Sequence, residues 1–188
     1  MTPISPVAEV PAQPSAGPLA VVRRTVVFLA VFAVLQGLWG AARGTVVERV
    51  AIDGITVASA VALIDLATPE VHAVAAGTRI RAPGGGINIL NGCEGVEVLF
   101  LLVAALCAFP LSPRRRLAGI VAGALFVFAI NQVRILALFY AFRADKSLFA
   151  LLHGTVAPVV VIALTGAFFL AWTKVGAGGT PSDAAART

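Results

Sequence analysis

Four long apolar stretches, separated by polar and basic segments, dominate the pattern of this chain. A helix needs roughly 20 predominantly apolar residues to cross a bilayer. The pattern therefore predicts membrane spans at about 25–40, 95–111, 117–142 and 156–173. The fold class that follows is an all-α membrane protein with four transmembrane helices.

The outer segment 41–94 has a different pattern, in which apolar and charged positions are mixed. Residues 46–66 place branched apolar side chains between carboxylates and arginines, which is typical of an amphipathic helix at a membrane surface. Asp53-Gly54, between two β-branched runs, is a competing hairpin signal. The alanine-rich stretch that follows favours the helix.

The end of this outer segment carries a strand pattern. Residues 78–81 alternate between polar and apolar, 83–86 read Pro-Gly-Gly-Gly, and 87–90 lead directly to Cys93. The pattern predicts a short β-hairpin whose second arm delivers the cysteine. We attribute the glycines of 83–86, and Gly92, to turn formation rather than to substrate contact.

Both ends of the chain are expected to be disordered tails, at 1–22 and 175–188, because they are rich in proline or in small polar residues. A single membrane-embedded domain then covers 23–174. Arg23 and Arg24 before an apolar run resemble a signal peptide. The run is long, however, and Arg43 follows it, which favours an uncleaved first span.

The composition agrees with a membrane protein. Of the 188 residues, 59% are hydrophobic and 12% are charged, against roughly 45–50% and about 25% in soluble domains. Mean hydropathy is +0.96 and the isoelectric point is about 10.2. The basic residues are spread between apolar runs rather than gathered on one soluble face, so the lipid bilayer, and not nucleic acid, is the expected environment.

Orientation follows from three consecutive arginines, Arg114, Arg115 and Arg116, in a very short loop. The positive-inside rule is strongest for such loops and places this one in the cytoplasm. Both termini are then cytoplasmic. Cys93 then faces the extracytoplasmic side of the membrane.

Cys93 is the candidate nucleophile. It lies in the polar loop Asn91-Gly92-Cys93-Glu94-Gly95, just before the second span, and the start of a helix favours negative charge. Cys107 is about 21 Å further along a helix, whereas a disulfide needs Cα atoms within about 7 Å. We expect Cys107 to pack as a small apolar residue. Zinc-type spacing is missing too, so no metal or cofactor is expected.

Two further polar residues lie at the same outer level. Arg134 is about 25 Å above the inner end of the third span, in a core of roughly 30 Å, with Asn131 on the same helical face. Ionisable residues inside a span are usually functional; the alternative is an arginine that only snorkels to the headgroups. His153 begins the fourth span and is a stronger base candidate than His72, which lies in the amphipathic segment.

Glu97 lies four residues after Cys93, on the same face of the expected helix. An unpaired carboxylate there would oppose formation of a thiolate. We therefore expect Glu97 to be paired, with Arg134 or Arg143 as partner.

A cysteine, an arginine and a histidine at the outer ends of three successive spans resemble the exosortase/archaeosortase family, over about residues 24–172. The motifs that carry the resemblance are Asn91-Gly92-Cys93-Glu94-Gly95, Asn131-Gln132-Val133-Arg134-Ile135 and His153-Gly154. Unlike larger members with more spans, this chain is similar to the compact forms called exosortase H or M.

The resemblance implies a membrane cysteine transpeptidase or protease. Its partners would be exported proteins that end in a short motif, a hydrophobic helix and a basic tail. Cys93, Arg134 and His153 would match the catalytic cysteine, arginine and histidine. Cys93 would form a thioester, His153 would transfer protons, and Arg134 would stabilise the oxyanion.

The sequence does not decide whether an amine or water releases the thioester. Two other functions also remain as alternatives. A thiol-redox membrane enzyme needs a pair of cysteines that can form a disulfide, and the spacing disfavours one. A non-catalytic four-helix scaffold or transport subunit would leave Cys93 unreactive.

Overall fold

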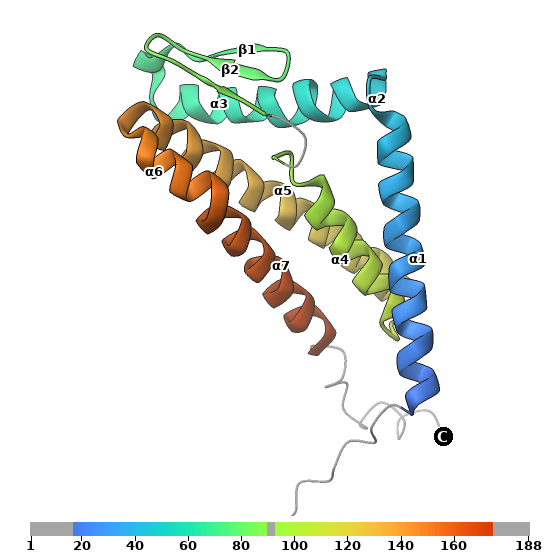
Figure 1. Ribbon diagram of the computed structural model, residues 1–188. Helices are drawn as coiled ribbons and strands as arrows, with labels where there is room; N and C mark the ends of the chain where they lie inside the picture. Colours follow the sequence, from blue (N-terminus) through green and yellow to red (C-terminus); the bar gives the residue numbers. More distant parts are fainter. Residues whose placement is uncertain (1–16, 90–92, 175–188) are drawn as a thin grey trace, which may run out of the picture.

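The computed structural model describes residues 17–89 and 93–174, which are mainly helical around one small sheet (Figure 1). The helices are α1 (Pro18–Ala42), α2 (Val46–Arg49), the π-helical η1 (Val50–Val57), α3 (Ala58–Ala67), the 3₁₀ helix η2 (Pro69–Val71), α4 (Val96–Ala108), α5 (Pro113–Ala144), α6 (Lys146–Leu151), the π-helical η3 (Leu152–Val156) and α7 (Ala157–Lys174). The strands are β1 (Val74–Ala76), β2 (Arg79–Arg81) and β3 (Ile87–Asn88). The predicted all-α membrane fold with a short hairpin is confirmed.

Within the described residues, four helical stretches are long and apolar enough to cross a membrane: Pro18–Ala42, Val46–Ala67, Pro113–Ala144 and Lys146–Lys174. Three of them cover predicted spans. The predicted span 95–111 corresponds to α4, which has only 13 residues. It is shorter because Phe109 takes extended backbone before Pro110, a position where proline disfavours helix in the preceding residue.

Helix α1 begins earlier than the predicted first span. The expected tail included residues up to 22, but the helix starts at Pro18, where proline suits the first helical position because its missing N–H has no helical acceptor. Arg23 and Arg24 therefore lie within the helix. The predicted tails at 1–16 and 175–188 lie outside the described residues.

The helix expected at 46–66 is confirmed as the continuous helical stretch of α2, η1 and α3. Its position at the membrane surface stays a prediction, because the stretch is also long and apolar enough to span a membrane. Asp53-Gly54 lies within the π-helical segment and not in a hairpin turn. One side of this stretch is buried, through Ile52, Val57 and Ile64 among others. Figure 1 shows it running across the upper ends of α1 and α5, with β1 and β2 above it and β3 running down towards α5.

The sheet has the order β1-β2-β3, and both pairs are antiparallel. Its inner face carries Ile80, which is fully buried, and Ile87. These side chains join a core with residues of α3 and α5. Gly86 allows the close approach of β3 to β2, because a Cβ there would lie 2.0 Å from the carbonyl oxygen of Ile80.

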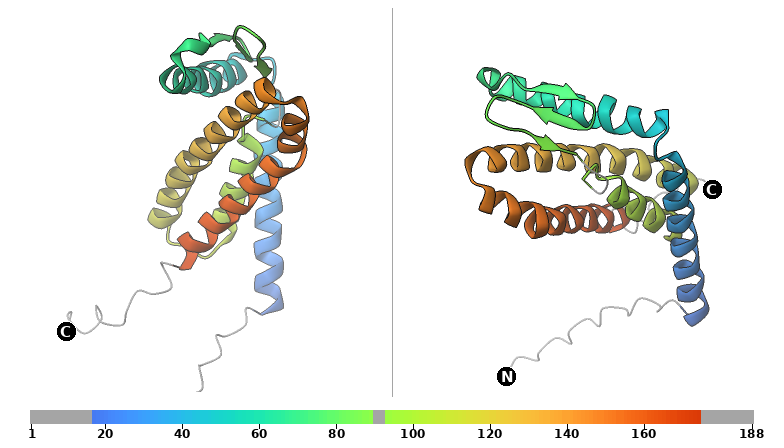
Figure 2. Two further views of the ribbon diagram at one scale, coloured as in Figure 1. Left: turned by 90° about the vertical axis from the view of Figure 1, so that its left-hand side faces the viewer. Right: turned by 45° about the horizontal axis from the view of Figure 1, so that its top comes forward.

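A second core holds the long helices together. It is centred on Leu102 and Leu106 of α4 and Val127 of α5, and aromatic side chains of α7 pack against it. Figure 2 shows α5 and α7 running side by side, with α4 against both and α1 against α4. This arrangement brings the end of α5, the start of α4 and the α6–η3 turn to the same end of the molecule (Figures 1 and 2).

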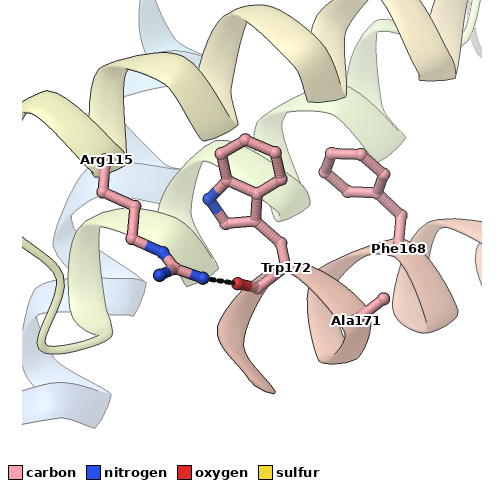
Figure 3. Close-up of a pocket in the computed structure, with 4 residues that line it drawn as sticks. All are labelled: Arg115, Phe168, Ala171 and Trp172. Atoms are coloured by element: carbon pink, nitrogen blue, oxygen red, sulfur yellow. Dashed lines mark hydrogen bonds between the residues drawn. The ribbon is translucent and has the colours of Figure 1, made fainter. Parts of the chain in front are cut away.

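The opposite ends of α5 and α7 meet at Arg115 and Trp172. Arg115 donates a hydrogen bond from Nη2 to the carbonyl oxygen of Trp172, and its guanidinium lies 5.9 Å from the indole centroid (Figure 3). Phe168 stacks on the same indole, and these side chains with Ala171 border a cavity of about 420 Å³. The contact ties α7 to α5 at the end remote from Cys93.

This junction predicts a matched pair of glycine variants. A Cβ at Gly119 would lie 2.5 Å from Nε1 of Trp172, whereas a Cβ at Gly166 would meet nothing within 4 Å. Overpacking costs about 1–3 kcal/mol, while alanine in a helix gains about 0.5–1 kcal/mol over glycine. We expect Gly119→Ala to lower the thermal midpoint of the detergent-purified protein and Gly166→Ala to keep or raise it. Equal midpoints for the two variants would contradict this packing.

Candidate active site

Cys93 lies at a bend three residues before the start of α4. Gly95 precedes the helix with φ +79°, in the left-handed region that favours glycine. The side chain of Cys93 is a half-buried thiol. Cys93 is thus presented just before the helix rather than within its first turn. Asn91 and Gly92, which the sequence suggested as supporting residues, lie outside the described residues.

Asn131 of α5 holds this bend in place. It is 1% exposed and donates a hydrogen bond from Nδ2 to the carbonyl oxygen of Cys93 at 3.2 Å. A Cβ at Gly95 would lie 2.9 Å from Cγ of Asn131. The contact therefore requires glycine both for its backbone conformation and for its missing side chain.

Arg134 follows on the same face of α5, one turn after Asn131. It is 9% exposed, and its Nη2 lies 4.0 Å from Sγ of Cys93 as a hydrogen-bond donor. A guanidinium at this position stabilises negative charge on sulfur. The alternative of an arginine that only reaches for headgroups does not fit a buried side chain directed at a thiol.

His153 approaches the same place from η3. Cys93 and His153 both border one cavity of about 140 Å³, whose other lining residues are Gly86, Ile87, Asn88, Ile89, Ile135, Leu138, Phe142 and Phe149. The imidazole stacks on Phe149, with 5.3 Å between ring centroids and 6° between planes. The structure thus brings together the three residues that the sequence singled out, from three separate elements.

The turn that carries His153 is π-helical for a local reason. The N–H of Ala157 donates to the carbonyl of Leu152, five residues back. Pro158 follows and has no N–H to offer to the carbonyls of His153 and Gly154, one turn before it. Widened helical turns of this kind are frequent at functional sites.

Asp145 fixes the start of α6, the helix that carries Phe149. Its carboxylate accepts hydrogen bonds from the hydroxyl and the backbone N–H of Ser147, each of which lowers the pKa of Asp145 below its usual 3.8. A lowered pKa in the folded state means that this cap stabilises the fold fully above pH 3.8. The contribution is lost as the pH falls through the lowered pKa.

Among the described residues, Arg143, one of the two expected partners of Glu97, makes other contacts. Arg143 donates from Nη1 to the carbonyls of Pro83, at 2.7 Å, and Gly85, at 3.5 Å. Glu97 is an exposed residue of the first turn of α4, where the helix dipole favours a carboxylate without a cation. Arg143 therefore secures the turn between β2 and β3.

Sequence reasoning missed Glu94. This carboxyl group is 7% exposed, directly follows Cys93, and its Oε2 is buried without a hydrogen bond among the described residues. Its place within the cysteine motif was the only available signal. In the part of the chain that the structure describes, no group of three or more His, Cys, Asp or Glu residues could hold a metal ion.

A thiol with a guanidinium beside it and an imidazole across a shared cavity has the components of a thiol-based acyl-transfer site. The fold defines a helical membrane protein in which these three side chains gather towards one end of the bundle. The sequence model of the family described as transmembrane exosortase matches residues 16–172. The chain belongs to this family, and the resemblance drawn from its motifs is confirmed. No curated protein and no solved structure matches the chain.

The contact of Gly95 with Asn131 predicts a change in thiol reactivity. In a Cys107→Ala background, Gly95→Ala adds backbone strain of about 1 kcal/mol and a clash that displaces Cys93 from Arg134. We expect an altered rate of alkylation of Cys93 by a small maleimide. Gly44, with φ +75° and nothing within 4 Å of its Cβ position, offers a control with strain but no clash. An unchanged rate in Gly95→Ala would contradict the positioning role.

Proposed function

We propose that this chain is a membrane cysteine transpeptidase or protease that cleaves the C-terminal sorting signals of exported proteins. The observation that carries the proposal is the position of Arg134, 4.0 Å from Sγ of Cys93, beside a cavity shared with His153. Membership of the transmembrane exosortase family supports the same activity.

In the proposed reaction, the thiolate of Cys93 attacks the carbonyl carbon of the scissile peptide bond. The carbonyl oxygen becomes negatively charged in the tetrahedral intermediate, and Arg134 stabilises this charge or orients the carbonyl before attack. Collapse of the intermediate breaks the C–N bond. It leaves the N-terminal part of the substrate as a thioester on Cys93.

His153 is the proposed proton carrier. It takes the proton of the thiol and gives it to the nitrogen of the departing peptide. Its ring stacks on Phe149 at the cavity wall, which holds the imidazole plane in one orientation. In the second step, His153 accepts a proton from the amine or the water that attacks the thioester. An amine acceptor makes the chain a transferase, and water makes it a hydrolase.

The proposed topology places this site outside the bacterial inner membrane. Arg115 lies at the start of α5, whereas Arg134 lies 19 residues later, about 28 Å along the helix. With the basic loop before α5 in the cytoplasm, both termini are cytoplasmic and Cys93 lies at the outer face. A substrate anchored by its own apolar helix, with a basic tail inside, then presents its outer flank to Cys93.

Replacement of the nucleophile tests the proposal directly. A secreted reporter is joined to the C-terminal segment of an exported protein of the same host that ends in motif, apolar helix and basic tail. When the reporter is expressed with the wild-type chain, we expect it to lose this segment. Immunoblotting detects the resulting decrease in its apparent mass. We expect no processing with Cys93→Ala and normal processing with the matched variant Cys107→Ala. Continued processing with Cys93→Ala would exclude the cysteine-enzyme mechanism.

The proposed role of Arg134 predicts that even a conservative substitution by lysine slows reporter processing. Removal of one oxyanion donor commonly costs about 10²–10³ in rate, and a lysine keeps the charge but loses the planar fork of donors. We expect Arg134→Lys to slow reporter processing by about that factor. Arg49→Lys, at an exposed position of α2, is the control. Processing at the wild-type rate by Arg134→Lys would argue that Arg134 only contributes charge.

A further inference from the structure

β3 is an edge strand whose open side borders the cavity that contains Cys93. The register pairs Ile80 with Ile87 and Arg79 with Asn88, and the N–H of Ile89 donates to the carbonyl of Thr78 at 2.8 Å. In an antiparallel ladder, alternate residues turn their backbone groups to the partner strand. Ile87 and Ile89 therefore face β2, whereas the backbone N–H and carbonyl of Asn88 point to the open edge.

The two faces beside this edge differ in chemistry. On the inner face, Ile87 and Ile89 are buried and border the cavity with Cys93. On the outer face, Arg79 and Arg81 are exposed and border a second hollow of about 280 Å³. Asn88 lines both hollows. An extended peptide at this edge would alternate its side chains between an apolar and a basic environment.

We propose that the segment of the exported protein that is to be cut docks as a fourth strand on β3, paired with the backbone of Asn88. This inference rests on the function proposed above. Main-chain hydrogen bonds supply affinity in strand addition, and alternate side chains supply specificity. An apolar side chain of the substrate enters the Cys93 cavity, and an acidic neighbour faces Arg79 and Arg81.

The charge at this edge favours a peptide with a carboxylate over an uncharged one. Arg79 and Arg81 lie on the same side of β2, and Arg79 stands directly opposite Asn88 in the register. Opposite charge at the rim of an interface steers association and sets the register of the partner. A substrate carboxylate at this place aligns the peptide, so that the scissile bond reaches Cys93.

The edge is already rigid before a substrate binds. Arg143 holds the turn before β3 through the carbonyls of Pro83 and Gly85. The hydroxyl of Thr78 donates to Oδ1 of Asn88 at 2.7 Å. Because both ends of the strand are held, little conformational entropy is lost when a peptide pairs with it.

A pair of proline variants tests the docking. Asn88→Pro removes the N–H that points to the open edge and keeps the backbone hydrogen bonds to β2. Asn88→Ala is compared with it, because both variants lose the side-chain bond from Thr78 and only the proline loses the N–H. Ala75→Pro is its match, because Ala75 faces the other open edge of the same sheet, away from Cys93. Using the reporter described above, we expect Asn88→Pro to lower the processing rate about tenfold or more, as loss of one or two hydrogen bonds would. Ala75→Pro should process at the wild-type rate.

Two readouts separate this inference from the proposed function. Alkylation of Cys93 by a small maleimide, in a Cys107→Ala background, should change less in Asn88→Pro than in Gly95→Ala, because Asn88→Pro alters the sheet edge and not the contact with Asn131 that positions Cys93. Equal processing by the two proline variants would overturn the docking. Processing that survives Cys93→Ala would instead overturn the function itself.

Exchanging the charges of the sheet edge and of the reporter tests the docking even where Asn88→Pro disturbs the fold. The double variant Arg79→Glu/Arg81→Glu should process the original reporter poorly. The same double variant should process a second reporter faster than the original one, if the acidic residues before the apolar helix of the second reporter are changed to lysine. Arg49→Glu is the control variant and should not change the preference. Equal slowing of both reporters by the double variant would mean that the arginines hold a lipid headgroup, and would overturn the assignment.

Discussion

The close contact between the bend at Cys93 and helix α5 is the constraint on which the site depends. The bend has no strand or helix of its own. It is held because Gly95 takes a left-handed conformation and leaves room for Asn131, which binds the carbonyl of Cys93. Arg134 is then one helical turn away from Asn131. A rigid helix thus sets the distance between guanidinium and sulfur.

The rest of the molecule brings separate elements to that contact. The stretch from α2 to α3 crosses the ends of the long helices and supports the sheet, and the sheet in turn places β3 beside the cavity. Arg115 and Trp172 tie α5 to α7 at the far end, so His153 returns to the same end as Cys93. The contact of Arg115 with Trp172 at one end of the bundle therefore supports the arrangement of Cys93 and His153 towards the other end.

Much of this arrangement was predictable from local patterns. Helical spacing placed Asn131 and Arg134 on one face, and the depth of Arg134 in its span matched the loop of Cys93. The hairpin followed from its turn residues. These features depend on neighbours in sequence. Helix ends were predicted less well, since α4 stops at Phe109 and α1 starts at Pro18, where single prolines decide the boundary.

Other features depend on contacts between residues far apart in sequence. The need for glycine at position 95 arises from Asn131 on another helix, and the local sequence gives no sign that Glu94 is buried. Arg134 or Arg143 was expected to pair with Glu97, but in the folded chain Arg143 binds the carbonyls of Pro83 and Gly85. No local pattern contains this information.

The widened turn at His153 has a consequence for the depth of the protein in its bilayer. The carbonyls of His153 and Gly154 lack the N–H of Pro158 as a donor, and residues 153–156 are exposed. Hydrocarbon does not tolerate lipid-facing carbonyls without donors. A position of this turn at the level of the hydrated headgroups gives these carbonyls water as a donor. In the proposed function, the thiol of Cys93 would then lie where both a peptide and a polar acceptor can reach it.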